Sequence, residues 1–409
     1  MPSSHEAPLR RLILPLLALA VLVAVVAWLM SRHVVRFRLG PGEELVGCAG
    51  ADGFAVCESD GLWRLYDAAA RSSDDGVALP TGVLGRPAIG PDGGAFALAD
   101  GGLLHTAPAH AGGLTRLLIP AQDLPQGARL LGLADGSQPV LAATAADGTR
   151  ELLVVPGAFA ADGDGPRLLH LHDTQGPARL SGDAGEADVV CSPAGAAVAL
   201  LTPLGWEAWS WDAGGRVRRA LAEGCDRKGA LFTPDARSLI VPGKVDGLWM
   251  LSLADGRMSL MAEGNFGLSA RVPASSAFRD RGEHVRLVAP QWSRDGWLQI
   301  YQTHVFGGGR WGFGISFTHH YGVALSADGR FIAYCQAQFD EHGQELFVED
   351  LLVVDFEESE ATVHVGSRRG GLAHQGPLFV GPGASLVYLA DGDVQRIELL
   401  PPGSGGEDS

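Results

Sequence analysis

The sequence predicts an all-β protein built from repeated small antiparallel sheets, preceded by one N-terminal transmembrane helix. Three observations predict this fold class. A short turn-and-strand pattern recurs along the chain, Gly supplies 57 of the 409 residues, and no amphipathic helical pattern follows residue 31. Many short apolar runs separated by glycine-rich turns are typical of all-β domains.

The composition favours a folded body that does not bind nucleic acid. Hydrophobic residues make up 46% of the chain and charged residues 19%, which is enough apolar surface for a large core. The formal net charge is −16, and residues 1–40 hold five of the 31 basic residues but only one of the 47 acidic ones. Because such an acidic body repels phosphate backbones, we expect no nucleic-acid partner.

Residues 12–30 carry no charge and are bracketed by Arg10, Arg11 and Arg32. A helix of this length spans the ~30 Å hydrocarbon core of a bilayer. We therefore predict an uncleaved single-pass transmembrane anchor, with residues 1–11 as a short cytoplasmic tail.

A cleaved signal peptide is the alternative, with Val25-Val26-Ala27 as a passable cleavage site. The apolar run continues past that site, which favours the anchor. Both alternatives carry the body across the membrane, so we expect a periplasmic or extracellular location.

A nine-residue pattern recurs, and residues 326–334, Ser-Ala-Asp-Gly-Arg-Phe-Ile-Ala-Tyr, are its clearest copy. Asp and Pro begin a turn, Gly accepts a positive φ, and the β-branched and aromatic residues that follow form a strand. Further copies begin at Gly90, Ser192, Thr233, Ser293 and Gly381, and weaker ones surround Asp52-Gly53 and Asp135-Gly136.

The copies are 33 to 60 residues apart, and one four-stranded propeller blade takes ~40–45 residues. We therefore predict a β-propeller over residues 33–400, of seven or eight blades with eight favoured, and a disordered tail over 401–409. The stretch from Glu263 to His284 is the first candidate for a loop insertion. A pair of β-sandwiches with coincidental turns is the alternative.

The repeat resembles that of the TolB-type β-propellers, which are related in architecture to WD-repeat proteins and read roughly S-P-D-G-x-x-I-A-Y. Residues 326–334 match that pattern everywhere except at the Pro, and the other copies match in part. The resemblance covers about residues 40–400. It implies a propeller fold and, commonly, protein binding at the cell envelope.

The last copy supplies only three strands before Pro401 and Pro402 end the structured chain. A ring must complete its last sheet or expose an edge. Because residues 33–39 alternate in hydropathy, we expect them to form the outer strand of the last blade.

Among the five cysteines, Cys48 and Cys57 would lie opposite each other in a hairpin that turns at Asp52-Gly53. They could form a disulfide in an oxidising compartment, or they could be two small buried residues. The remaining cysteines show no metal-ligand spacing and are predicted to lie in the core; these are Cys191, Cys225 and Cys335.

His170 and His172 alternate along one strand, with Asp173 beside them. They are weak candidates for a metal site, and a polar outer strand face is the favoured explanation. We therefore predict no metal and no cofactor.

Catalytic signatures are missing from the sequence. It contains no G-x-S-x-G, no H-E-x-x-H and no G-x-x-x-x-G-K-[ST]. The single G-x-G-x-x-G, from Gly307 to Gly312, is not followed by a helical pattern. We expect a protein without catalytic activity.

Two aromatic segments remain as candidates for binding. Trp209 and Trp211 share one face of a predicted strand and Trp206 takes the other, and we expect them to pack between blades. Arg310 and Trp311 follow three glycines and are predicted to form a binding loop.

These observations favour a membrane-anchored scaffold that binds a protein partner at a bacterial cell envelope. The alternative is an enzyme, or a binder of small ligands or sugars, that uses the central channel. That alternative requires carboxylate, His or Arg side chains to converge on the axis from different blades.

Overall fold

The computed structural model describes residues 33–399 with gaps, of which the longest are 178–188 and 267–276. Three predicted segments lie outside the described residues: the cytoplasmic tail (1–11), the anchor (12–30) and the C-terminal tail (401–409). Within the described part there is no α-helix, and accordingly no helix long and apolar enough to cross a membrane. The all-β prediction is confirmed for this part of the chain.

Eight antiparallel sheets each contain a path of four strands. Sheets 1 to 4 consist of β2 (Glu44–Gly47), β3 (Gly53–Cys57), β4 (Trp63–Asp67) and β5 (Val77–Ala78); β6 (Ala88–Ile89), β7 (Ala95–Ala99), β8 (Gly102–Thr106) and β9 (Thr115–Pro120); β10 (Arg129–Ala134), β11 (Gln138–Thr144), β12 (Arg150–Val154) and β13 (Leu169–His170); β16 (Val189–Cys191), β17 (Ala197–Thr202), β18 (Gly205–Trp211) and β19 (Val217–Glu223).

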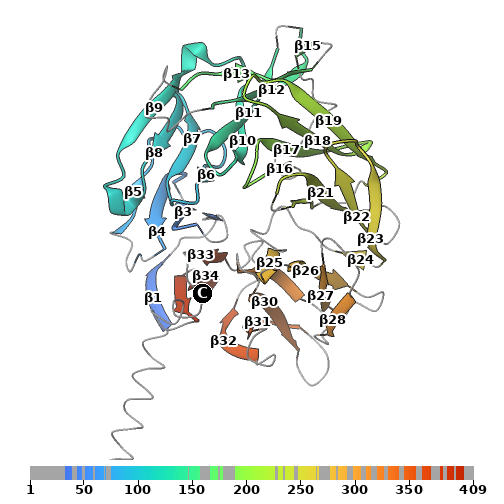
Figure 1. The fold of residues 1–409 in the computed structure, drawn as a ribbon. Coiled ribbons are helices and arrows are strands. Elements are labelled where there is room, and N and C mark those ends of the chain that lie inside the picture. Colours follow the sequence, from blue (N-terminus) through green and yellow to red (C-terminus); the bar gives the residue numbers. More distant parts are fainter. Residues whose placement is uncertain are drawn as a thin grey trace, which may run out of the picture.

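The remaining sheets continue in chain order, and Figure 1 shows all eight arranged around a common centre. Sheets 5 to 8 consist of β20 (Leu231–Phe232), β21 (Ser238–Pro242), β22 (Gly247–Ser252) and β23 (Met258–Glu263); β24 (Asn265–Phe266), β26 (His284–Trp292), β27 (Leu298–His304) and β28 (Arg310–Gly314); β29 (His320–Leu325), β30 (Phe331–Phe339), β31 (Glu345–Asp355) and β32 (Thr362–Arg369); β33 (Leu378–Val380), β34 (Ser385–Ala390), β35 (Asp393–Glu398) and β1 (His33–Arg38).

Seven of the eight copies of the repeat occupy the same place in their sheets, between the first and the second strand. The turn at 90–94 joins β6 to β7, and the turn at 326–330 joins β29 to β30. Five further copies connect the corresponding strands of sheets 1, 3, 4, 5 and 8. The copy at Ser293 differs, because it lies between β26 and β27, the second and third strands of sheet 6. Since the sheets share one strand order around the ring, we call the end that carries these turns the motif face.

Hydrogen bonds explain the Ser or Thr at the start of the pattern. The Thr233 hydroxyl accepts a hydrogen bond from the Ser238 N–H at 3.0 Å and donates one to Asp235 Oδ1 at 2.6 Å. Asp235 Oδ1 also accepts from the Arg237 N–H at 3.1 Å. Thr233 is fully buried, so its hydroxyl fixes the turn from the inside.

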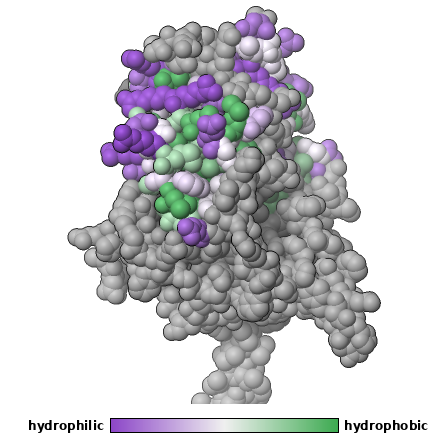
Figure 2. All heavy atoms as spheres, turned by 90° about the vertical axis from the view of Figure 1, so that its right-hand side faces the viewer, coloured by the Kyte–Doolittle hydropathy of each residue, from purple (hydrophilic) through white to green (hydrophobic). Residues whose placement is uncertain are grey.

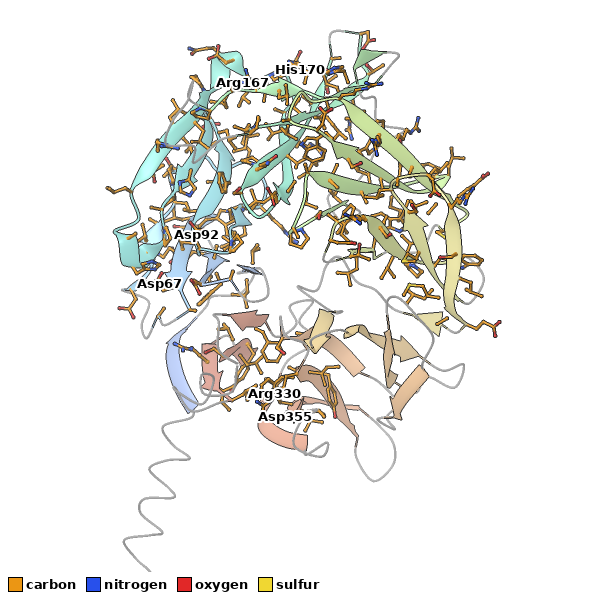
Figure 3. The ribbon with its side chains drawn as sticks, in the orientation of Figure 1. Asp67, Asp92, Arg167, His170, Arg330 and Asp355 are labelled. Atoms are coloured by element: carbon orange, nitrogen blue, oxygen red, sulfur yellow. The ribbon has the colours of Figure 1, made fainter. Side chains whose placement is uncertain are left out.

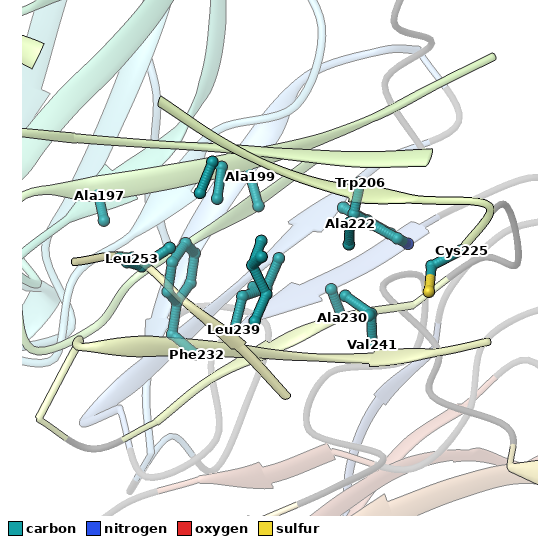
Figure 4. Packing of buried hydrophobic residues seen from close by; sticks show 13 residues of the cluster. Ala197, Ala199, Trp206, Ala222, Cys225, Ala230, Phe232, Leu239, Val241 and Leu253 are labelled. Carbon is teal, nitrogen blue, oxygen red and sulfur yellow. The ribbon is translucent and has the colours of Figure 1, made fainter. Parts of the chain in front are cut away.

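The core lies between neighbouring sheets. Trp206 of β18 packs with Phe232, Leu239 and Val241 of sheet 5 in one fully buried cluster (Figure 4). Trp209 packs on the opposite side of β18, against sheet 3, where Trp211 is partly buried. The predicted division of the three tryptophans between two faces is confirmed, as is their packing between sheets.

The outer strands carry the exposed side chains. In β19, Val217 is buried whereas Arg218 and Arg219 are not, and on β23 Leu260 is 46% exposed. Figure 2 shows this side of the molecule, where hydrophilic and hydrophobic residues are interspersed in the described part.

The closure predicted for the chain ends is confirmed. β1 pairs antiparallel with β35, and the sheet order is β1-β35-β34-β33. The N-terminal strand is therefore the outer strand of the sheet that the C-terminal strands begin.

The predicted insertion between Glu263 and His284 contains two short strands. β24 follows β23 directly, and both β24 and β25 (Ala277–Arg281) pair with β26. Sheet 6 has five strands for this reason.

The register predicted for Cys48 and Cys57 is wrong. Cys57 lies opposite Glu44, and Val46 lies opposite Ala55. Cys48 itself lies outside the described residues. The predicted disulfide depended on Cys48 lying opposite Cys57, and the observed register does not place Cys57 opposite that position.

Asp52-Gly53 causes this difference because it is not the turn of a two-residue hairpin. Gly53 already belongs to β3 and lies opposite Asp67. The Asp52 N–H donates to the Pro91 carbonyl of sheet 2 at 3.0 Å. A Cβ on Gly53 would lie 2.7 Å from the Tyr66 carbonyl oxygen, so glycine is required here by close packing.

Candidate functional site

A cavity of about 500 Å³ lies where the first strands of sheets 1 to 4 meet. Each of these strands contributes to its wall: Val46 from β2, Ile89 from β6, Leu130 from β10 and Val189 from β16. The first strands lie nearest the centre of the ring in Figure 1. The cavity is therefore part of the central channel, and its volume is in the range of ligand-binding pockets.

Three arginines line this cavity: Arg86, Arg129 and Arg150. Arg86 precedes β6, Arg129 begins β10 and Arg150 begins β12, so two different sheets contribute. None of the described lining residues is an Asp, Glu, Lys or His. We call Arg86, Arg129, Arg150 and Thr144 the arginine pocket.

The strand register puts most of the arginine pocket on one sheet face. Arg129 lies opposite Ala142, and Thr144 lies opposite Arg150. Opposed residues of an antiparallel pair share a face, and so do alternate residues of one strand. Arg129, Thr144 and Arg150 are therefore neighbours on the same face of sheet 3.

The arginine pocket lies at the end of the ring remote from the motif face. β10 begins at Arg129 and runs to the turn at Asp135-Gly136, whereas β11 runs back from that turn and ends at Thr144. We call this end of the ring the pocket face. It also carries the turn between β17 and β18, where Leu204 is 57% exposed.

The chain enters the ring from the opposite side. β35 begins at the pocket face, because β34 runs there from the motif turn before it. Arg38 lies opposite Asp393 and His33 lies opposite Ile397. Since the strands are antiparallel, His33, the first described residue, lies toward the motif face.

The histidine candidates do not line this pocket; they lie on the last strand of sheet 3 and just after it. Both His170 and His172 are exposed, and Leu171 between them is fully buried. His170 Nδ1 lies 3.3 Å from Glu151 Oε2, and Figure 3 shows His170 at the outer rim near Arg167. This matches a polar outer strand.

Among the described side chains, no third metal ligand accompanies this pair. The side chain of Asp173 lies outside the described residues, although its backbone belongs to β14 (His172–Asp173), which pairs with β15 (Gly176–Pro177). Across the residues that are described, no group of three His, Cys, Asp or Glu side chains could hold a metal ion.

The structure places Arg310 and Trp311 in a strand and not in a loop, and their binding role stays a prediction. Both residues belong to β28, where Arg310 lies opposite Thr303 and Trp311 lies opposite Gln302 of β27. The alternating sequence after the glycines forms the outer strand of sheet 6, and backbone pairing with β27 fixes it there.

Burial favours the neutral forms of two titratable side chains, His105 and Cys191. Desolvation lowers the pKa of His105. Two smaller effects act on the same pKa: the charge of Asp92 raises it and that of Arg116 lowers it. The His105 ring packs on Phe96, with 4.7 Å between the ring centroids. Burial raises the pKa of the Cys191 thiol to about 12. A thiol with such a pKa is not an activated nucleophile.

The predicted core position of Cys225 is confirmed, whereas Cys191 is only partly buried at the edge of the core. Cys225 is buried between sheets 4 and 5, and Cys191 packs against the cluster between sheets 3 and 4. The side chain of Cys335 lies outside the described residues, although its backbone belongs to β30.

Sequence reasoning missed the arginine pocket and one buried ion pair. Glu207 of β18 is 1% exposed and forms an ion pair with Arg219 of β19, whose guanidinium lies 5.2 Å from the ring centroid of Trp209. No sequence motif marks either feature.

No protein-family model and no curated protein matches the chain. Among solved structures, the WD40 domain of SCAP from fission yeast is similar, with 12% sequence identity and a TM-score of 0.56 over 87% of this chain and 94% of that one. This similarity shows that the chain has a β-propeller fold.

Two further solved structures are similar at lower scores. An oligogalacturonate lyase in complex with manganese has 12% identity and a TM-score of 0.48, covering 89% of this chain and 93% of that one. The dihydro-heme d1 dehydrogenase NirN has 17% identity and a TM-score of 0.39, covering 82% and 77%.

Proposed function

We propose that this chain is an eight-bladed β-propeller of the TolB type, anchored in a bacterial membrane by residues 12–30, that binds a protein partner outside the cytoplasm. The observation that carries this proposal is the position of His33 toward the motif face. An anchor that joins the ring there directs the pocket face away from the membrane, toward partners.

The surface of the pocket face supports binding rather than catalysis. It presents two of the large exposed hydrophobic side chains, Leu84 at 54% and Leu204 at 57%. Exposed apolar side chains beside charged ones are typical of protein-binding surfaces. Loops held by a rigid ring suit such a role.

The alternative of ligand binding in the channel also has an observation in its favour. Arg86 and Arg129 converge from two sheets on one cavity, as that alternative requires. Arginine remains protonated at every physiological pH and so cannot serve as a general base. This favours recognition of an anion over acid–base chemistry.

Site-specific photo-cross-linking in the native membrane tests the proposal. A photoreactive amino acid replaces Leu84 or Leu204 on the pocket face, and Leu260 on the outer strand β23 is the matched exposed control. We expect adducts with the same protein from positions 84 and 204 and none from 260. Adducts from 260 alone would contradict the proposed binding face.

The anchor is tested separately with the full chain and a variant that lacks residues 12–30. We expect the full chain to resist alkaline carbonate extraction and the variant to be released. A protease added outside the inner membrane should digest the body of the full chain. Protection of the body in intact cells and spheroplasts would contradict the proposed location.

A further inference from the structure

An exposed leucine marks the connection between β8 and β9. Leu114 is 76% exposed, more than any other large hydrophobic side chain in the described part of the chain. Because β7 runs away from the motif turn at 90–94 and β8 is antiparallel to it, β8 ends at the motif face. We call residues 107–114 the leucine turn. Leu117 of β9 is 49% exposed, so the apolar surface continues onto the strand.

Contacts within the chain fix the leucine turn. The Ala107 N–H donates to the Leu114 carbonyl at 3.0 Å. His110 Nδ1 lies 3.1 Å from Asp67 Oδ1 at the end of β4, so the turn also contacts sheet 1. An ordered backbone thus presents the exposed side chain of Leu114, and its burial against a partner costs little conformational entropy.

The leucine turn differs in charge from the equivalent connections of sheets 4 and 5, which are also described in full. Those connections each carry an exposed carboxylate and an exposed guanidinium, Asp212 with Arg216 and Asp255 with Arg257. The leucine turn contains no Asp, Glu, Lys or Arg. Because charged groups are costly to remove from water, it is the connection of these three that suits an apolar environment.

The proposed anchor determines what lies against this end of the ring. The anchor ends at residue 30, and β1 begins with His33 at the motif face. A chain advances at most about 3.6 Å per residue, so His33 lies within about 11 Å of the end of the membrane span. The interfacial region of a bilayer is itself about 5–8 Å thick on each side. The motif face therefore stands against the lipid interface.

The leucine turn lies on the rim of the ring near this entry point. Sheet 8 packs against sheet 1 through Val387 and Phe54, and sheet 1 bonds to sheet 2 through the Asp52 N–H and the Pro91 carbonyl. Figure 1 shows β1, β5 and β9 following one another along one side of the ring. Both β1 and β9 are outer strands that begin at the motif face. The leucine turn and the start of β1 thus share one rim and one end.

We propose that the leucine turn inserts Leu114 into the interfacial region of the membrane that holds the proposed anchor. The ligand is the apolar part of the phospholipid interface, because the turn offers an aliphatic side chain and no formal charge for a phosphate. This inference rests on the proposed function and adds a lipid contact to it. A second point of contact beside the anchor fixes the tilt of the ring and keeps the pocket face turned away from the membrane.

Photo-cross-linking to lipid tests this inference with the full-length protein in phosphatidylcholine vesicles. A photoreactive amino acid replaces Leu114, and the matched control is Leu204, which is 57% exposed on the pocket face. We expect phospholipid adducts, identified by mass spectrometry, from position 114 and none from position 204. High salt should leave the yield unchanged, because the contact is apolar.

The decisive variant is Leu114→Glu, with the photoreactive group moved to the neighbouring exposed residue Ala111. We expect the variant to lower the lipid-adduct yield at position 111 at least about fivefold, because a carboxylate resists transfer from water. The matched control Leu204→Glu should leave that yield unchanged, and Leu114→Ile should retain it. Equal urea-unfolding midpoints show that the variants are folded.

Three outcomes would overturn the inference: no lipid adduct from position 114, equal adducts from positions 114 and 204, or an equal yield at position 111 in Leu114→Glu and the unchanged protein. Carbonate extraction separates this failure from failure of the proposed function. A chain that resists extraction but gives no adduct at position 114 retains its anchor and lacks the lipid contact. A chain that is extracted contradicts the anchor itself.

Discussion

Val35 of β1 lies opposite Gln395 of β35, and the neighbouring Val34 lies opposite Arg396. These pairs join the N-terminal strand to the C-terminal end of the chain. They complete the sheet of β33, β34 and β35, which would otherwise expose an unpaired edge.

Paired cysteines at these positions test the closure. Opposed pairs in an antiparallel ladder alternate between hydrogen-bonded and non-hydrogen-bonded sites. One of the double variants Val34→Cys/Arg396→Cys and Val35→Cys/Gln395→Cys is therefore suited to a disulfide. We expect it to oxidise and to stabilise the protein by about 2–4 kcal/mol, measured by urea unfolding with and without reductant.

The control for this experiment is Val35→Cys/Val394→Cys, whose side chains point to opposite faces of the sheet. Efficient oxidation of the control, or of none of the three pairs, would contradict the observed register.

Thr233 should be sensitive to loss of its hydroxyl. Thr233→Val keeps the volume but removes the hydroxyl that accepts from the Ser238 N–H and donates to Asp235 Oδ1. We expect the free energy of unfolding to fall by about 1–3 kcal/mol, measured by urea denaturation. Thr233→Ser retains the hydroxyl and should lose much less; equal losses in both variants would show that the methyl group, not the hydrogen bonds, matters.

The ion pair of Glu207 and Arg219 predicts that loss of the arginine alone destabilises the protein more than loss of both charges. Arg219→Ala leaves a buried carboxylate without its cation and removes the guanidinium from the face of Trp209. We expect a loss of about 2–3 kcal/mol in unfolding free energy, within the range for broken charged pairs and reduced because Arg219 is partly exposed.

Adding Glu207→Gln to Arg219→Ala removes the unpaired charge. The double variant should therefore be more stable than Arg219→Ala alone. If the loss in unfolding free energy of the double variant equals the sum of the losses of Arg219→Ala and Glu207→Gln measured singly, the two residues are not coupled.

His105 should make the fold sensitive to acid. Desolvation lowers its pKa below the ordinary 6.5, so the unfolded chain takes up a proton at higher pH than the folded protein does. Stability from this group is complete above pH 6.5 and falls as the pH drops toward the folded-state pKa. We expect His105→Gln to flatten this decline, measured by urea unfolding from pH 7.5 to 5.

The matched control is His110→Gln, because His110 is exposed and lies 3.1 Å from Asp67. It should leave the acid-dependent decline in place. An unchanged decline in His105→Gln would assign the acid sensitivity to other groups.

The repeated turns were predictable because each copy carries its own hydrogen-bonding chemistry. Thr233 and Asp235 fix one turn by local contacts, and Ser326 fixes another by accepting from the Phe331 N–H at 2.9 Å. Such contacts depend on spacing along the chain, which a sequence displays directly.

The first sheet shows where this reasoning ends. Asp52-Gly53 matches a two-residue hairpin turn, yet contacts with sheet 2 and with Tyr66 decide its conformation. These contacts come from residues distant in sequence. The pairing of Cys57 therefore could not be derived from its own neighbourhood.

The arginine pocket was hidden for a similar reason. Arg86, Arg129 and Arg150 share no motif, and only the ring brings their two sheets to one cavity. The three glycines before Arg310 predicted a flexible loop. Arg310 and Trp311 instead belong to the outer strand β28, because their backbones pair with β27.

Among the described strands, the sheet partner of β1 is synthesised late. β1 precedes every other described strand in the chain, whereas β35 follows them all. The first described strand must therefore remain without this neighbour while the other sheets fold, and a final docking step pairs it with β35. Premature termination anywhere before β35 prevents this docking step. We therefore expect truncated products to be open rings with an unpaired sheet edge, which quality-control proteases degrade readily.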